Sequence, residues 1–451
     1  MGTIFNIRKN LKPAQIMVLS FGGVILLGAL ILMLPISSQA RVVTPFIDTL
    51  FTATSAVCVT GLVIVDTGTY WSVFGKTIIL ILIQIGGIGF MTMTTSLAII
   101  MGKKIGLRNR MIMQEALNQF SLSGVIRLTK YVIMITFSVE LLGALLLSIR
   151  FIPDFGLKNG IYYSIFHAVS AFCNAGFDIM GGFKSLTEYA TDPLVSLVVA
   201  ILVIIGGLGF AVIADLTRFK SIRKMSLHSK LVLLVTISLI VFGFFSILFL
   251  EYNNPKTMGS FTWGEKFVAS FFASVTPRTA GYNTLDLNGL TMPTRFITMI
   301  LMFIGGSPGS TAGGLKTTTF GIMILYLIGI FKGSDEINFA NRRISKDVAN
   351  RTVAVIMISV IWVVFMTFLL AVFQPTMGLE SIMFESLSAF GTVGLSLGIT
   401  PFLSVYGKII LTIMMFFGRL GPLTIIVAMN NKANKTGKDL LRYPEGKIIV
   451  G

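Results

Sequence analysis

The chain has 451 residues, of which 54% are hydrophobic and only 12% are charged, and its formal net charge is +17. Because a soluble domain carries about 25% charged residues, this composition excludes an ordinary soluble protein and indicates a membrane protein. The basic excess then reflects the placement of loops at the inner membrane face rather than a nucleic-acid partner.

The first quarter of the chain, residues 1–110, reads as two membrane spans on either side of a short segment. Residues 14–34 follow a basic N-terminus, and this apolar run of about 20 residues suits a retained span better than the core of a signal peptide. The short helix-like segment 46–56 comes next, and the second span, 78–101, is interrupted by glycines at 86, 87 and 89. A basic connector follows, with Lys103, Lys104, Arg108 and Arg110.

Three further quarters repeat this plan, at residues 111–224, 225–345 and 346–430, and a basic tail covers 431–451. The expected first spans are 131–151, 231–250 and 353–373. The short segments are 161–172, 263–275 and 381–390, and the second spans are 195–216, 296–331 and 409–428.

Each short segment ends in a loop of the same design. An aromatic residue precedes a glycine by ten positions in all four copies, and three copies have Ser-Ala at the same offset, whereas the third has Val275-Thr276. A fixed repeat of this kind indicates one structural unit used four times. The loops are Val57, Cys58, Val59, Thr60 and Gly61; Cys173, Asn174, Ala175 and Gly176; Arg278, Thr279, Ala280 and Gly281; and Gly391, Thr392, Val393 and Gly394.

The order span, loop, span predicts an all-α membrane protein of eight transmembrane helices and four re-entrant pore loops around one pseudo-fourfold axis. Basic residues gather in the connectors between quarters, so the positive-inside rule puts these connectors and both termini in the cytoplasm. An even number of spans per quarter requires parallel repeats. We therefore expect a multi-pass protein of the cell membrane whose loops enter from outside.

The chemistry of the four loops favours an ion pore. Non-helical backbone at membrane depth must be buried in protein or line a water-filled cavity. These loops contain no carboxylate and offer carbonyls, hydroxyls such as that of Thr60, and one glycine each. Rings of carbonyls can replace the hydration shell of a monovalent cation. The alternative, tight turns in a packed helical bundle, requires neither re-entrant depth nor fourfold recurrence.

On these residues the chain resembles the membrane subunit of the Ktr/Trk/HKT superfamily of potassium transporters, most closely the bacterial Ktr type. The resemblance rests on the four loops, on SAFCNAGF, TPRTAGYN and SAFGTVGL, on QIGGIGF, and on the ending RYPEG. It implies that K⁺ is the substrate and that the four loops form the selectivity filter, with Gly61, Gly176, Gly281 and Gly394 as the filter glycines. A serine in the first loop marks sodium-transporting relatives, and this chain has glycine there.

The resemblance also implies partners. The family's membrane subunit is a homodimer whose tail, here residues 443–451, helps to form the contact, and a cytosolic ring with nucleotide-binding RCK domains docks on the connectors and controls the pore. Binding of membrane lipids by the basic connectors is equally allowed. No cofactor and no nucleic acid are expected, and activation by Na⁺ stays open.

The second span of the third quarter is broken by a glycine-rich segment, residues 305–316. One interpretation is a helix break tolerated by packing, and the other, which the resemblance favours, is a mobile gate below the filter. The residues concerned are Gly305, Gly306, Ser307, Pro308, Gly309, Ser310, Thr311, Ala312, Gly313, Gly314 and Lys316.

Two arginines stand at unusual places. Arg419 lies within a span, where a charge is costly, and acts either as a positive barrier near the pore or in an ion pair with Glu385 or Glu140. Arg278 replaces a small residue in the third loop and is expected to point away from the pore toward an acid such as Asp286.

Three aspartates, Asp66, Asp178 and Asp286, follow the loops and either concentrate cations at the outer mouth or are ordinary solvated loop acids. Cys58 and Cys173 are expected to be small buried thiols.

The sequence contains no ATP-binding loop and no catalytic set, so no enzyme is expected. The competing functions are a sodium-coupled solute carrier, a class that tends to show inverted repeats and few re-entrant loops, and a less selective monovalent cation channel.

Overall fold

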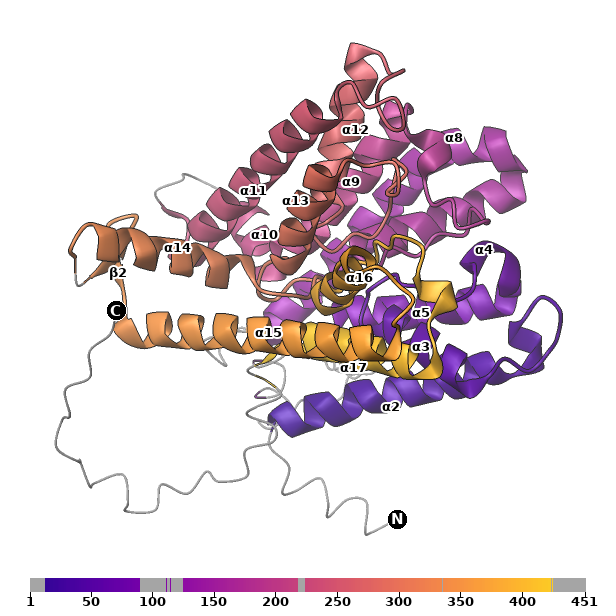
Figure 1. Cartoon of the computed structure of the whole chain (residues 1–451), viewed down its shortest axis with the longest axis horizontal. Helices are drawn as coiled ribbons and strands as arrows, with labels where there is room; N and C mark the ends of the chain where they lie inside the picture. Colours follow the sequence, from indigo (N-terminus) through magenta and orange to yellow (C-terminus); the bar gives the residue numbers. More distant parts are fainter. Residues whose placement is uncertain are drawn as a thin grey trace, which may run out of the picture.

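The computed structural model describes residues 13–89, 111, 114, 125–217, 224–334, 336–422 and 424. The basic connector at 103–110 and the tail at 431–451 lie outside the described residues. The described part is mostly helical, and its elements can be followed in Figure 1. The first half contains α2 (Pro13–Met33), η1 (Pro35–Ser37), α3 (Phe46–Val57), α4 (Thr67–Tyr70), α5 (Val73–Ile88), α8 (Val125–Phe172), η2 (Thr187–Tyr189), α9 (Pro193–Leu208) and α10 (Phe210–Thr217).

The second half continues with α11 (Leu227–Glu251), α12 (Trp263–Val275), α13 (Met292–Phe303), α14 (Thr317–Phe331), β1 (Ile337–Phe339), β2 (Arg342–Ile344), α15 (Lys346–Phe373), α16 (Leu379–Gly391), η4 (Thr400–Phe402) and α17 (Val405–Leu420). The two short strands form an antiparallel hairpin between α14 and α15, at one end of the molecule (Figure 1).

Glycines end the second helix of three groups. Gly89, Gly209 and Gly421 directly follow α5, α9 and α17 and have φ angles of 86°, 92° and 82°. Glycine adopts this left-handed conformation without steric cost and commonly stops a helix. The expected span 195–216, which contains a glycine cluster, is broken: α9 and α10 meet at Gly209 with a bend of 102°.

Another break in the second quarter lies inside the element labelled α8. The expected span 131–151 and the short segment 161–172 both lie within α8, which is kinked at Gly156, where φ is 77°. Pro153 stands just before this kink and cannot donate the usual helical hydrogen bond. The non-helical backbone at Gly156 therefore separates the expected span from the expected short segment.

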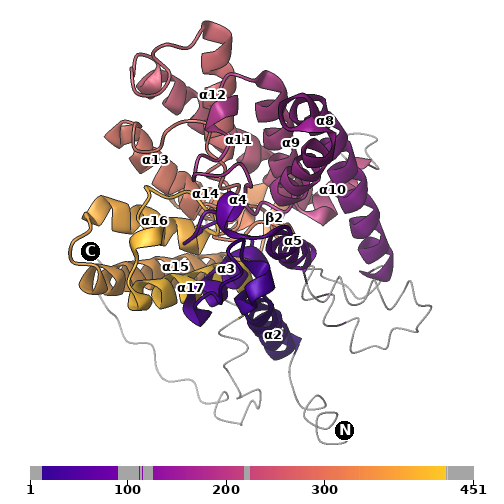
Figure 2. The same ribbon diagram turned by 90° about the vertical axis from the view of Figure 1, so that its right-hand side faces the viewer.

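Four groups of helices follow one another around a common centre, in the order of the sequence colours (Figure 2). The ring of groups closes through contacts of α5 with α8, α9 with α12, α13 with α16, and α17 with α3. Two ion pairs join neighbouring groups: Lys408 Nζ lies 2.6 Å from Asp48 Oδ1, and Arg295 Nε lies 3.0 Å from Glu380 Oε1. The short helices α3, α12 and α16 and the end of α8 all lead into the centre.

Several helices are suited to a membrane. Ala14–Met33, Ile126–Phe172, Leu227–Glu251 and Lys346–Phe373 are long and apolar enough to cross one, and the bent pair α9 and α10 would make a fifth span. Their outward faces carry exposed large apolar side chains, for example Leu27, Leu142, Phe249 and Phe368, as lipid contact requires. The chain is therefore a multi-pass membrane protein. Shorter apolar helices, including Val73–Ile88 and Met292–Phe303, leave the expected total of eight spans as a prediction.

Candidate functional site

The four loop glycines form a closed ring at the centre of the molecule. A Cβ atom added to Gly61 would lie 3.1 Å from the Cα of Gly176, and one on Gly176 would lie 2.8 Å from the Cα of Gly281. A Cβ on Gly281 would lie 3.3 Å from the Cα of Gly394, and one on Gly394 would lie 3.0 Å from the Cα of Gly61. Each such Cβ would also press on a carbonyl oxygen of the neighbouring loop at 2.2–2.6 Å. No side chain fits at any of the four positions.

The backbone of each loop alternates in handedness. The residue two places before each glycine has a positive φ: 53° at Val59, 58° at Asn174, 71° at Thr279 and 50° at Thr392. The glycines themselves have φ angles of 67–95°. Left-handed residues that alternate with right-handed or extended ones turn successive peptide groups to the same side. A β-branched residue such as Val59 rarely adopts this conformation and keeps it only when its surroundings impose it.

The recurring Ser-Ala pair fixes the loops to the helices that lead into them. Ser55 and Ser388 each accept a hydrogen bond through Oγ at 3.1 Å, from the N–H of Gly61 and Gly394 respectively. In the second loop, Ser170 Oγ instead donates to the carbonyl of Phe177 at 2.8 Å. The third loop has no serine at this offset, and Thr276, one residue later, donates to the carbonyl of Tyr282.

The loop hydroxyls divide into two kinds. The hydroxyls of Thr60 and Thr392 are buried and have no hydrogen-bond partner within the described part of the chain. The hydroxyl of Thr279 lies 3.2 Å from the side-chain amide of Asn174. Cys58 and Cys173 are buried free thiols, as expected. Thr60 and Thr392 stand one and two residues before their glycines, so the two unpartnered hydroxyls do not occupy equivalent places in the loops.

The glycine-rich segment 305–316 folds back on itself directly behind the loops. Gly305 N donates to Leu315 O at 2.9 Å, and Thr317 N donates to Gly306 O at 3.0 Å. Within the segment, Thr311 Oγ1 lies 3.3 Å from Phe172 O and 3.0 Å from the side-chain amide of Asn174 in the second loop.

The same segment also touches the other groups. Ser307 N donates to Gly207 O at 3.0 Å, and Gly314 N donates to Gly418 O at 3.2 Å. A Cβ on Gly313 would lie only 2.2 Å from Thr392 Oγ1 in the fourth loop. The segment therefore packs against the second and fourth loops and against the ends of α9 and α17.

Arg419 ties this segment to the first group. Its Nη1 donates to the carbonyl of Thr311, and its Nη2 donates to the carbonyls of Gly86 and Gly87 at the end of α5. The expected ion pair with Glu385 or Glu140 is wrong. Glu140 instead accepts from Gln84 Nε2 at 3.0 Å, and Glu385 accepts from the hydroxyl of Thr400.

Arg278 points away from the glycine ring, as expected, but it does not reach Asp286. Its guanidinium donates to the carbonyls of Thr236 and Gly305 at 3.3 and 3.4 Å, whereas Asp286 accepts from the N–H of Asn288 at 3.0 Å. The expectation of an acidic partner is therefore wrong. Both arginines donate to backbone carbonyls, although Nε of Arg278 stays buried without a partner among the described residues. A sequence gives no sign of such partners, because every residue carries a carbonyl.

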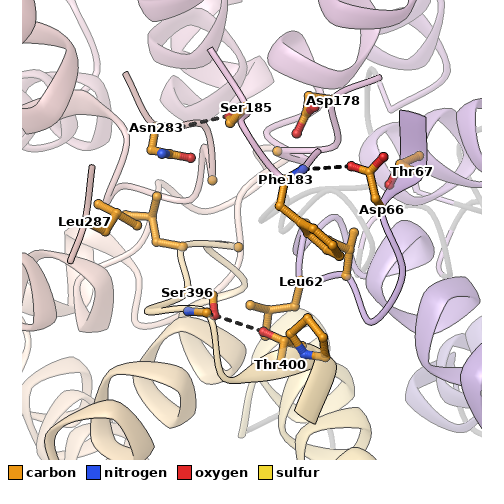
Figure 3. A pocket seen from close by; sticks show the side chains of 18 of the residues that line it. Leu62, Asp66, Thr67, Asp178, Phe183, Ser185, Asn283, Leu287, Ser396 and Thr400 are labelled. Atoms are coloured by element: carbon orange, nitrogen blue, oxygen red, sulfur yellow. Dashed lines mark hydrogen bonds between the residues drawn. The ribbon is translucent and has the colours of Figure 1, made fainter. Parts of the chain in front are cut away.

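A cavity of about 390 Å³ lies on the other side of the glycine ring, and all four glycines line it. Asp66, Asp178 and Asp286 also line it, and Figure 3 shows Asp66 and Asp178 at its edge. The Asp66 carboxylate accepts from the N–H of Phe183 at 3.0 Å and from the N–H of Thr69 at 2.8 Å. Burial raises the pKa of Asp178 to about 7, and the nearby charge of Asp66 adds to this shift.

Sequence reasoning missed several residues of this cavity, among them Phe183 and Ser185. Both lie in the loop that follows the second glycine, and both have a positive φ, 56° and 51°. The pair Gly181-Gly182 just before them is the signal that could have drawn attention to this loop, since adjacent glycines often precede unusual backbone conformations.

Comparisons with known proteins agree with this arrangement. The family model TrkH, described as a cation transport protein, matches residues 11–436. The chain is 44% identical to Ktr system potassium uptake protein B of Bacillus subtilis (strain 168) over 439 residues, which are 97% of each chain. It is 42% identical to the potassium/sodium uptake protein NtpJ of Enterococcus hirae over 448 residues, 99% of this chain and 98% of that one.

The fold is similar to that of the potassium transporter TrkH from Vibrio parahaemolyticus, with a TM-score of 0.71 over 92% of this chain and 84% of that one. At 18% identity this likeness concerns the fold alone. The family match over most of the sequence and the full-length similarity to the relatives show that the chain belongs to the TrkH family of cation transport proteins.

Proposed function

We propose that the chain takes up K⁺ across the cell membrane through the ring of four loops, which serves as its selectivity filter. The observation that carries this proposal is the closed ring of Gly61, Gly176, Gly281 and Gly394, with a left-handed residue two places before each glycine. Successive carbonyls turned to one side can replace the water shell of a monovalent cation. The printed names of the two relatives, which describe potassium and potassium/sodium uptake, support this choice of ion.

The surroundings of the ring favour a cation. The helices α3, α8, α12 and α16 end at the loops, so the negative ends of four helix dipoles point toward the centre. The membrane potential then drives the ion inward, with ~2.3 kcal/mol per charge for each 100 mV.

The proposal includes the predicted topology. The quarters 1–110, 111–224, 225–345 and 346–430 each contribute a span, a re-entrant loop and a second span, which gives eight spans with parallel orientation. The termini and connectors then lie in the cytoplasm, and the cavity of about 390 Å³ is the outer mouth.

The segment 305–316 is proposed to be the gate. It packs against the second and fourth loops, on the side opposite the outer cavity. Arg419 holds it through the carbonyl of Thr311. An ion that leaves the filter inward would meet this segment, so conduction requires it to move.

Control by partners is the remaining part of the proposal. Two relatives carry the names Ktr system potassium uptake protein B and D, and we infer that this chain likewise works in a system, as a homodimer with a cytosolic RCK-type ring. The hairpin of β1 and β2, with Arg342 and Arg343 on its second strand, is a basic docking surface at the end of α14.

Ion uptake into liposomes that contain the purified protein tests the proposal. With an inside-negative potential, we expect accumulation of K⁺ and Rb⁺, competition between the two ions, and no requirement for an organic solute. Accumulation of an organic solute coupled to Na⁺ would contradict it. Equal uptake of Na⁺ and K⁺ would support the second candidate, a less selective monovalent cation channel, which the name of the NtpJ relative favours.

A further inference from the structure

The loop after the second glycine crosses one side of the outer cavity. We call residues 179–186 the outer strap. It is fixed to the first group because Phe183 N donates to Asp66 Oδ1 at 3.0 Å. It is fixed to the third group because Asn283 N donates to Ser185 Oγ at 3.2 Å and Leu186 N donates to Asn283 O at 3.1 Å. Figure 3 shows both side-chain contacts at the edge of the cavity.

The backbone of the outer strap is strained at its centre. Gly181, Gly182 and Phe183 have φ angles of 92°, 67° and 56° in succession. Glycine adopts such angles freely, but a bulky aromatic residue rarely does. Phe183 keeps this conformation because the carboxylate of Asp66 holds its N–H.

The strain is not explained by burial of the phenylalanine ring. Phe183 is 53% exposed, and its side chain lines the cavity and points toward Leu62 (Figure 3). A strained residue normally reflects a demand made by its surroundings. Here the result of the strain is an aromatic face presented to the cavity above the glycine ring.

The lining of the cavity combines the ring of Phe183 with further apolar side chains, polar side chains and three carboxylates. Its volume of about 390 Å³ falls in the range of roughly 300–1,000 Å³ that is usual for small-molecule sites. Carboxylates oppose the binding of anions, and the apolar side chains of the lining offer contact to an organic group. An organic cation suits both, since aromatic rings bind quaternary ammonium groups through cation–π attraction. The residues that matter are Phe183, Leu62, Phe402, Asp66, Asp178 and Asp286.

We propose that the outer cavity binds monovalent quaternary ammonium ions against the ring of Phe183. Because the four glycines line the same cavity, a bound ion also blocks entry to the loops. The proposed binding of quaternary ammonium ions depends only on the cavity. The proposed block of ion entry also depends on the proposed K⁺ uptake. The two are therefore measured separately.

Binding is tested by calorimetric titration of tetraethylammonium into the purified full-length protein in detergent. The matched variants are Phe183→Leu, which keeps an apolar side chain of similar reach, and Phe183→Trp, which keeps an aromatic face. The main-chain bond to Asp66 is available to both variants. We expect roughly fivefold weaker binding for Phe183→Leu and no loss for Phe183→Trp. Equal affinity of the leucine variant, or no binding at millimolar concentrations of ligand, would overturn the proposal.

The ligand offers a second control. Choline should bind more tightly than dimethylbutanol, its uncharged isostere in which carbon replaces the ammonium nitrogen, and the difference should shrink in Asp286→Asn. Asp286 is exposed and accepts only a local backbone bond within the described residues, so this variant should fold. Equal binding of the two ligands would mean that the cavity does not select for charge and would refute the assignment.

Block is tested by adding tetraethylammonium outside liposomes during Rb⁺ uptake. We expect inhibition in the wild type and at least fivefold less potent inhibition in Phe183→Leu. Absence of Rb⁺ uptake would count against the proposed function, and calorimetry would still decide the binding. Uptake that continues unchanged while tetraethylammonium is bound would show that the ligand does not lie in the ion path and would overturn the block.

Discussion

The side-chain amide of Asn174 lies 3.0 Å from the hydroxyl of Thr311. Asn174 belongs to the second loop of the glycine ring, and Thr311 belongs to the segment 305–316 behind it. The same amide lies 3.2 Å from the hydroxyl of Thr279 in the third loop. One fully buried side chain thus connects two loops of the glycine ring with the proposed gate, and movement of the segment must break this contact.

Loss of the contact between Asn174 and Thr311 should loosen the gate. We expect Asn174→Gly and Thr311→Val each to raise Rb⁺ flux about fivefold in liposomes that lack a regulatory partner, because a buried hydrogen bond contributes about 1 kcal/mol. Glycine is chosen at position 174 because φ there is 58°. The double variant should gain less than the sum of the two single ones, since both changes remove the bond between Asn174 and Thr311. Strictly additive gains would mean that the two residues act independently.

The sequence left open whether Arg419 acts as a positive barrier to cations or as a structural tie. Substitutions at this position distinguish the two, because they change charge and geometry independently. Arginine reaches carbonyls of Thr311 and Gly86 on two different elements, which a lysine ammonium cannot match. We expect both Arg419→Lys and Arg419→Met to raise Rb⁺ flux roughly tenfold, because a hydrogen bond to a charged group contributes about 1.5–3 kcal/mol. If lysine preserves the low flux of the wild type and methionine does not, Arg419 acts as a positive barrier instead.

The loops themselves could be predicted from the sequence, because their signals are local. The spacing from aromatic residue to glycine, together with the apolar runs, predicted α12 at its observed bounds and α3 and α16 within two residues. The bend of 102° after α9 could not be predicted, since a glycine cluster within an apolar run is compatible with a continuous helix as well as with a break.

The partners of the buried arginines could not be predicted either. Arg278 and Arg419 bind backbone carbonyls that lie far away in sequence, and only the folded chain brings them together. The role of Phe183 depends on a bond from its own N–H to Asp66, a contact that the residue type does not reveal. The sequence therefore predicted the glycines of the proposed filter, whereas the contacts that hold the proposed gate and the outer strap are visible only in the structure.

The ring of glycines should tolerate no side chain. In Gly176→Ala, the new Cβ would lie 2.6 Å from Ala280 O and 2.8 Å from the Cα of Gly281, at a φ of 67°. Both contacts are with backbone, which cannot move aside as a flexible side chain could. We expect Rb⁺ uptake to fall at least tenfold, a cost of about 1.4 kcal/mol or more. Gly23→Ala is the matched control, since nothing lies within 4 Å of its added Cβ, and normal uptake by Gly176→Ala would refute the filter assignment.

The ion pair between Lys408 and Asp48 should stabilise the closure of the ring of helix groups. The two side chains are only 13% and 17% exposed, and their charged atoms are 2.6 Å apart. Removal of one partner leaves a charge that is largely buried, so we expect Lys408→Met to lower the free energy of unfolding by about 2–3 kcal/mol. Thermal unfolding in detergent measures this. Lys184→Met is the control. The side chains of Lys184 and Glu188 are 60% and 62% exposed, so their ion pair should contribute little to stability.

Uptake should depend on external pH through Asp178. Burial raises the pKa of this carboxyl to about 7, so it is charged above that pH and becomes neutral as the pH falls through 7. Asp66, Tyr163 and Tyr282 are the titratable groups that lie near it. A negative charge at the outer mouth attracts the incoming cation, and one unit charge about 8 Å away in water contributes roughly 0.5 kcal/mol.

We therefore expect the KM for K⁺ to rise about twofold as the external pH is lowered from about 8 to about 6, the range that brackets the pKa of Asp178. Asp178→Asn should show the higher KM at both pH values and lose the pH step, because its amide does not titrate. Asp286→Asn is the control: its carboxyl is exposed at the rim of the same cavity, so this variant should keep the step while its KM rises at both pH values. If the change of KM with pH persists in Asp178→Asn, another group is responsible for it. Asp178 would then not be the carboxylate that attracts the incoming cation.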